Sequence, residues 1–156
     1  MALVMGVGYA PAQQKSMKDQ VAGAWTLVSI DQTDESGKKV QIFGPNAKGT
    51  QIMDASGQWV QIIWNADVAK FKVNNRQQGT PEENTAAVRA MTASFGTWSV
   101  DEGNKTLTVK YAGSLLPNQA GTESKRTISV SGDELRVQNP RTGSGVQSET
   151  VWRRAK

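Results

Sequence analysis

The feature that most constrains the fold is a repeated alternation of apolar and polar residues along short segments. At the first of them, Trp25, Leu27 and Ser29 fall on one face of an extended chain and the residues between them on the other. A period of two is typical of β-strands with one buried face. Segments of this kind, separated by turn residues, are expected at 25–30, 39–43, 49–53, 58–65, 97–101, 106–112, 123–131, 134–139 and 146–154.

The connections between these segments decide how the strands pair. Most are short turns such as Asp54-Ala-Ser-Gly57, which links two strands as a hairpin. Parallel strands need crossovers of a dozen residues or more, and only the stretch 66–94 is that long. We therefore expect an all-β protein with one inserted helix. The expected architecture is an antiparallel barrel of about 8–9 strands that occupies residues 15–156 as a single domain.

The inserted helix is predicted over residues 81–93. Thr80 is suited to the N-cap and Pro81 to the first helical position, and Glu83 completes a capping box. The following alanines favour helix. The helix is expected to cover the outside of the 58–65 strand or to act as a lid on the barrel.

Composition limits the chemistry that the barrel can perform. The chain of 156 residues contains no His and no Cys, which excludes thiolate and imidazole catalysis as well as His or Cys metal sites. Tyr, Lys and carboxylates remain, but no pair stands at a spacing that forces proximity. We expect no metal and no cofactor, and the balance lies against an enzyme.

The charge and the N-terminus give expectations about partners and location. The net charge is +4 and basic residues adjoin only in isolated pairs, so no nucleic-acid partner is expected. Residues 1–14 are uncharged and largely apolar, and Ala10-Pro11-Ala12 resembles a leader-cleavage site. This segment is interpreted as an incomplete secretory leader, with a native tail as the alternative. It is too short to span a bilayer, and the protein is expected to be secreted or periplasmic.

Several short motifs occur in an order that resembles a known family. They are Gly23-Ala-Trp25, Phe43-Gly-Pro-Asn46, Asp54-Ala-Ser-Gly57, Gly79-Thr80-Pro-Glu-Glu83, Phe95-Gly-Thr-Trp98 and Val151-Trp152-Arg-Arg154. Together they resemble the lipocalin-like domain family of small bacterial and fungal proteins, within the calycin-like barrels. The resemblance runs from about residue 21 to residue 154. It implies a ligand cavity inside the barrel. Histidine-dependent activities of relatives do not transfer, because residues 108–111 contain no histidine.

The resemblance also implies how one end of the barrel closes. In such proteins the Gly-x-Trp tryptophan packs under an arginine of the last strand. Here Gly23 and Trp25 match the motif, and Arg154 (or Arg153) is the expected partner through a cation–π contact. These three residues are predicted to be structural.

Aromatic and apolar side chains are the candidates for a cavity wall. Both faces of the 58–65 strand are apolar, so its outer set is expected to lie under the helix or against a second subunit. The predicted cavity residues are Trp59, Ile63, Trp64, Trp98, Tyr111, Arg126, Ile128 and Trp152.

Arg126 is the one charged residue among these candidates. An inward-facing guanidinium needs an acceptor, and we expect Glu149, Asp101 or the carboxylate or phosphate of a ligand. The leading hypothesis is the binding of a small apolar or amphipathic molecule. The alternatives are a small-molecule enzyme of isomerase or cyclase type in the same cavity, and an assembly module, including a homodimer, that uses an aromatic patch.

Overall fold

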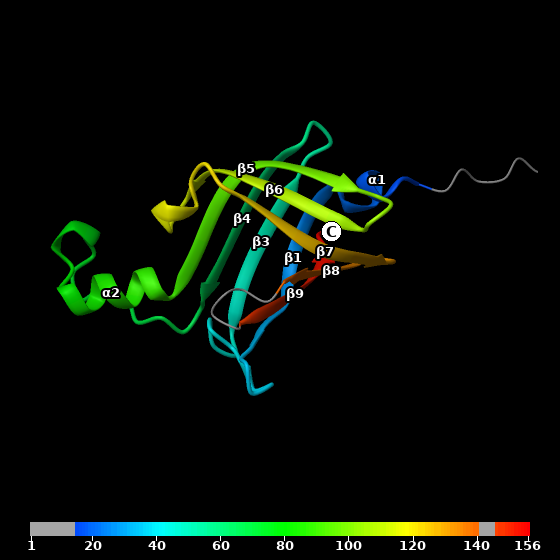
Figure 1. Ribbon diagram of the computed structural model, residues 1–156. Coiled ribbons are helices and arrows are strands. Elements are labelled where there is room, and N and C mark those ends of the chain that lie inside the picture. Colours follow the sequence, from blue (N-terminus) through cyan, green and yellow to red (C-terminus); the bar gives the residue numbers. More distant parts are fainter. Residues whose placement is uncertain (1–14, 141–145) are drawn as a thin grey trace, which may run out of the picture.

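The computed structural model describes residues 15–140 and 146–156, so the expected leader lies outside the described residues. The strands form one antiparallel sheet that closes on itself, because β9 pairs with β1 (Figure 1). Eight strands make the closed barrel and β2 is an extra strand at its edge, which confirms the predicted fold class. The strands are β1 (Gly23–Thr33), β2 (Lys39–Val40), β3 (Ala47–Met53), β4 (Gln58–Asn65), β5 (Met91–Asp101), β6 (Thr106–Ser114), β7 (Glu123–Ser131), β8 (Glu134–Asn139) and β9 (Gln147–Arg154).

Short helices lie between or before the strands. They are α1 (Met17–Val21), the 3₁₀ turn η1 (Arg76–Gln78), α2 (Pro81–Arg89) and the 3₁₀ turn η2 (Pro117–Gln119). The capping box of α2 is present, with the Thr80 hydroxyl accepting from the Glu83 N–H and the Glu83 carboxylate accepting from the Thr80 N–H. The helix ends at Arg89 rather than at residue 93, because the chain from Met91 onward pairs with β4 and becomes the start of β5.

The expectation that α2 covers the outer face of β4 is wrong. None of its residues is buried, and in Figure 1 the helix stands clear of the barrel strands. On β4 the side chains of Ile62 and Trp64 remain 41% and 49% exposed. The alanine-rich helix carries too little apolar surface to hold it against the sheet.

The barrel interior is filled by the inward-facing residues of every long strand. In β5, for example, Ser94 and Trp98 are buried, whereas Phe95 and Thr97, which lie between them in the sequence, are exposed. The largest fully buried side chains are Trp25, Trp152, Met53, Ile63, Leu107, Ile128 and Leu135. α1 lies at one end of the barrel, where Val21 is fully buried and Met17 packs against the core.

Two local features depart from regular strands. β5 has a bulge between Phe95 and Gly96, where the backbones run so close that a Cβ on Gly96 would lie 1.9 Å from the Lys110 carbonyl oxygen. The segment predicted as a strand over 39–43 pairs with β1 only at Lys39–Val40. It then turns, and Phe43 is buried.

Candidate functional site

The end of the barrel next to α1 is closed by an arginine and a tryptophan. Trp25 and Arg154 face each other in the β1–β9 register, and the Arg154 guanidinium carbon lies 4.2 Å from the centre of the Trp25 ring. The Trp25 Nε1–H donates to the Val21 carbonyl at 2.8 Å. Arg154 donates from Nη1 to the Ala22 carbonyl (3.0 Å) and from Nη2 to the Gln20 carbonyl (2.6 Å).

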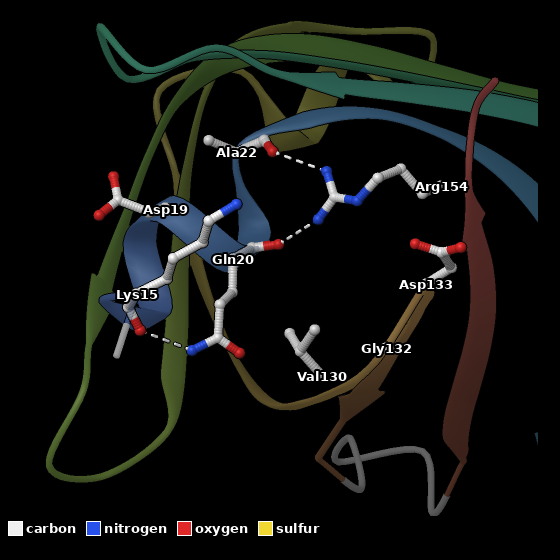
Figure 2. A pocket seen from close by; sticks show the side chains of 8 residues that line it. All are labelled: Lys15, Asp19, Gln20, Ala22, Val130, Gly132, Asp133 and Arg154. Atoms are coloured by element: carbon white, nitrogen blue, oxygen red, sulfur yellow. Dashed lines mark hydrogen bonds between the residues drawn. The ribbon is translucent and has the colours of Figure 1, made fainter. Parts of the chain in front are cut away.

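These contacts tie α1 to the last strand. Figure 2 shows Arg154 reaching across to the two carbonyls, with Asp133 beside it at the β7–β8 turn. Gly23 has a φ of 133°, and a Cβ there would lie 2.7 Å from Arg154 Nη1, so only glycine leaves room for the guanidinium. The hollow drawn in Figure 2 is therefore bordered by Arg154, whose guanidinium is already hydrogen-bonded to two backbone carbonyls.

A cavity of about 450 Å³ lies at the opposite end of the barrel. β1 pairs with β3 only from Gly23 to Thr26, and beyond this point its remaining residues pair with β9 and, at the tip, with β2. The barrel wall is thus incomplete at this end, and the loop after β2 brings Phe43 to it. Lining residues include apolar Ile30, Ile42 and Phe43 and polar Gln61, Ser94, Tyr111, Ser124 and Arg126.

Among the described lining residues, Arg126 is the buried charged group of this cavity. Its side chain is 8% exposed, as is that of Tyr111. Arg126 donates from Nη2 to the Tyr111 hydroxyl and, at 3.4 Å, from Nε to the Ser124 hydroxyl. Its guanidinium carbon lies 5.6 Å from the centre of the Trp59 ring, and Trp59 meets Tyr111 edge to face at 5.5 Å. Aromatic rings and hydroxyls therefore surround a buried cation.

The carboxylates expected to pair with Arg126 are elsewhere. Glu149 accepts from Gln138 at 2.8 Å and lies 3.4 Å from Arg136, and Asp101 accepts from Asn104. That expectation is wrong because Glu149 in β9 and Asp101 at the end of β5 stand at outward-facing positions of their strands. No ion pair to Arg126 is found within the described part of the chain. Burial lowers the pKa of Arg126, and the interaction with Tyr111 opposes this effect.

Two further buried donors have no hydrogen-bond acceptor among the described residues. They are Nε2 of Gln51 and Nε1 of Trp59, whose side chains are 1% and 2% exposed. Gln51 stands opposite Gln61 in the β3–β4 register, and Gln61 lines the cavity. Two buried side-chain donors of the barrel interior are thus left without a described acceptor.

The predicted cavity residues separate into three groups. Tyr111 and Arg126 line the cavity. Five others are buried in the core without lining it: Trp59, Ile63, Trp98, Ile128 and Trp152. In two of these the ring N–H donates a hydrogen bond within the protein. Trp98 donates to the Asp54 carbonyl and Trp152 to the Thr150 hydroxyl. Trp64 is wrong as a cavity residue, because the period of two places it on the outer face of β4.

Sequence reasoning missed most of the cavity wall. Ser124 could have been predicted from the sequence, since it stands two residues before Arg126 and therefore shares its face of the strand. Ser94 lies in a stretch that was predicted as helix or loop. Phe43 comes from a turn, and nothing in its neighbourhood indicates that it points inward.

The chemistry available at this cavity is limited. The titratable side chains among its described lining residues are Glu123, Tyr111 and Arg126, and Glu123 is exposed at the rim. Tyr111 accepts a hydrogen bond from Arg126. Within the described ranges, no group of three or more acidic residues is arranged to hold a metal ion.

The outer face of β3, β4 and β5 carries exposed apolar side chains. Ile52, Ile62, Trp64 and Phe95 are 41–55% exposed. In the sheet register Thr50 stands opposite Ile62, and Trp64 lies between Lys48 and Met91. We call Ile52, Ile62, Trp64 and Phe95 the outer patch.

A closed antiparallel barrel with an arginine-capped tryptophan at one end and a cavity at the other defines a lipocalin-like protein. The chain belongs to the lipocalin-like domain family, whose sequence profile matches residues 22–155. No helix in the described residues is both long and apolar enough to cross a bilayer.

Two solved structures have similar barrels. A lipocalin-like protein from Bacteroides uniformis has 12% sequence identity and a TM-score of 0.46, over 87% of this chain and 99% of that one. Wild-type fluorescent protein UnaG has 14% identity and a TM-score of 0.41, over 89% of this chain and 100% of that one. No curated protein sequence matches the chain.

Proposed function

We propose that this protein binds a small amphipathic molecule in the cavity at the open end of the barrel. The observation that carries the proposal is the cavity itself, about 450 Å³ in volume and lined by both apolar and polar side chains. This volume lies within the range of roughly 300–1,000 Å³ typical of small-molecule sites. Ile30, Ile42 and Phe43 offer apolar area, and Arg126 with Tyr111 offers a polar contact.

Binding is better supported than catalysis by the same cavity. A general acid or base needs a titratable group that is free to exchange a proton with the substrate. The phenol of Tyr111 is engaged by Arg126, and Glu123 is exposed to solvent at the rim. Among the described lining residues, these are the two groups that an isomerase or cyclase could use as a general acid or base.

Titration of the full chain with decanoate and with decan-1-ol, followed by calorimetry and tryptophan fluorescence, tests the proposal. The informative variant is Ser94→Phe, because Ser94 is 7% exposed and lines the cavity, so a phenyl ring there would fill it. Ser99→Phe is the matched control, since Ser99 is exposed on the same strand. Binding that is lost in Ser94→Phe and kept in Ser99→Phe is the expected result. If the wild-type protein binds neither decanoate nor decan-1-ol, nor the decyl phosphate tested below, the proposal is refuted.

The outer patch supports a second proposal, self-association of two barrels through this face. A two-fold interface places the same surface on both partners, and an apolar, uncharged patch is complementary to itself. Lys48 lies at its edge, opposite Trp64. Light scattering over a range of concentrations is expected to show a dimer that Trp64→Ser weakens. A monomer at all concentrations would exclude it.

A further inference from the structure

We propose that the ligand of the cavity is an acid with a single carboxylate, and that Arg126 binds this carboxylate with its free N–H groups. The inference rests on the proposed function and specifies the chemical class of the ligand. Four observations carry it: the burial of Arg126, its lack of a counter-charge among the described residues, its unused donors, and two other buried donors in the barrel that lack a described acceptor.

The first two observations concern charge. A guanidinium that is 8% exposed has lost most of its hydration, which is costly unless an anion compensates it. In the described ranges Arg126 has no carboxylate partner and only hydroxyl acceptors, from Tyr111 and Ser124. Arg154 offers a contrast inside the same barrel, because it donates to two backbone carbonyls that lie at the closed end.

The third and fourth observations concern hydrogen bonds. A guanidinium has five N–H donors, and two of its nitrogens, Nε and Nη2, make the bonds described for Arg126. Its Nη1 has no bond to a described residue. Gln51 Nε2 and Trp59 Nε1 are also buried without acceptors. A carboxylate accepts several hydrogen bonds and donates none, so it is the ligand group that unused donors favour.

The charge balance also separates a carboxylate from a phosphate monoester. Among the described residues that line the cavity, Arg126 is the only cation, and it offsets one negative charge. A phosphate monoester carries close to two negative charges at neutral pH. The carboxylate of Glu123 at the rim would repel the second charge.

The experiment compares ligands that share one alkyl chain. Decanoate, decan-1-ol and decyl phosphate are titrated into the wild-type chain, Arg126→Met and Lys125→Met. Methionine keeps an unbranched apolar side chain at the buried position. Lys125→Met is the matched control, because Lys125 is the exposed neighbour on β7 and its loss changes the net charge equally. Far-UV circular dichroism shows whether each variant is folded.

We expect Arg126→Met to weaken decanoate binding roughly 10- to 100-fold, the range for losing hydrogen bonds to a charged group. Decan-1-ol affinity is expected to change little, and Lys125→Met is expected to bind decanoate like the wild type. If Arg126→Met does not fold, the wild-type preference for decanoate over decan-1-ol still decides the question.

The outcomes separate this inference from the function on which it rests. If none of the three compounds binds, the proposed function fails. If decanoate and decan-1-ol bind equally to the wild type, or Arg126→Met keeps full decanoate affinity, ligand binding stands and the carboxylate inference is overturned. Tighter binding of decyl phosphate than of decanoate would also overturn it.

Discussion

Replacing Arg154 with methionine tests how the closed end of the barrel is held. Arg154 connects three parts of the protein, since it stacks on Trp25 at 4.2 Å and donates to the carbonyls of Gln20 and Ala22. Methionine keeps an apolar stem of similar length and removes the guanidinium. The substitution therefore deletes two charge-assisted hydrogen bonds and one cation–π contact with little change in packing.

The magnitude follows from these three contacts. Hydrogen bonds to charged groups contribute roughly 1.5–3 kcal/mol each, and the lower value applies because Arg154 is only partly buried. A partly exposed cation–π contact adds about 0.5–1 kcal/mol. We expect the free energy of unfolding to fall by about 3.5–4 kcal/mol, a large share of the roughly 5–15 kcal/mol typical of folded domains.

Urea unfolding followed by circular dichroism measures this change as a lower midpoint with an unchanged slope. Arg153→Met is the control, because Arg153 is the adjacent residue and is exposed. Exposed substitutions usually change stability by less than about 0.5 kcal/mol. Arg154→Lys is expected to fall between the two, since an ammonium keeps the charge without the planar fork. Equal midpoints for Arg154→Met and Arg153→Met would refute the assigned role of Arg154.

Three further predictions concern other parts of the molecule. Gly96→Ala is expected to unfold the protein or to lower the free energy of unfolding by more than about 3 kcal/mol, because the added Cβ would lie 1.9 Å from a backbone carbonyl oxygen. Gly103→Ala is the control, since a Cβ there would lie 3.5 Å from the nearest side-chain atom and is expected to have a small effect. Expression and thermal melting compare them. Thr80→Ala removes the α2 cap and is expected to speed hydrogen exchange in α2 without lowering the melting temperature, because no residue of that helix is buried. The pKa of Asp54 lies below its ordinary value, first because it accepts from the Ser56 hydroxyl and then from the Gln58 N–H. The ionised Asp54 carboxylate therefore contributes its full stabilising effect above the unfolded-state pKa of about 3.9, and this effect is lost as the pH falls through the lower pKa of the folded state. Below pH 4 the urea midpoint of the wild type is expected to fall more steeply than that of Asp54→Asn.

The local signals along the chain were sufficient for the architecture. The period of two and the short turns predicted the antiparallel barrel, and the capping box of Thr80 and Glu83 marked the start of α2 correctly. The predicted end of α2 at residue 93 was wrong, because the chain from Met91 onward pairs with β4 and forms the start of β5. Here a tertiary contact overrides the local preference of an alanine-rich segment for helix.

The candidate site was predicted only in part. Alternation says that Trp59 and Trp64 lie on opposite faces, but both faces of β4 are apolar, so the sequence does not say which one is inside. The structure buries Trp59 and leaves Trp64 exposed. The partner of Arg126 was missed because Tyr111 comes from the neighbouring strand β6, and its approach depends on the β6–β7 register.

By itself, the sequence determined what is local: strands, turns, the helix start and the exclusion of thiol and imidazole chemistry. The tertiary structure alone decided where the cavity lies. That cavity exists because β1 leaves β3 after Thr26 and the loop after β2 brings in Phe43. The physical reason is that closing a barrel joins residues far apart in the chain, and the space left between them depends on the registers of all its strands at once.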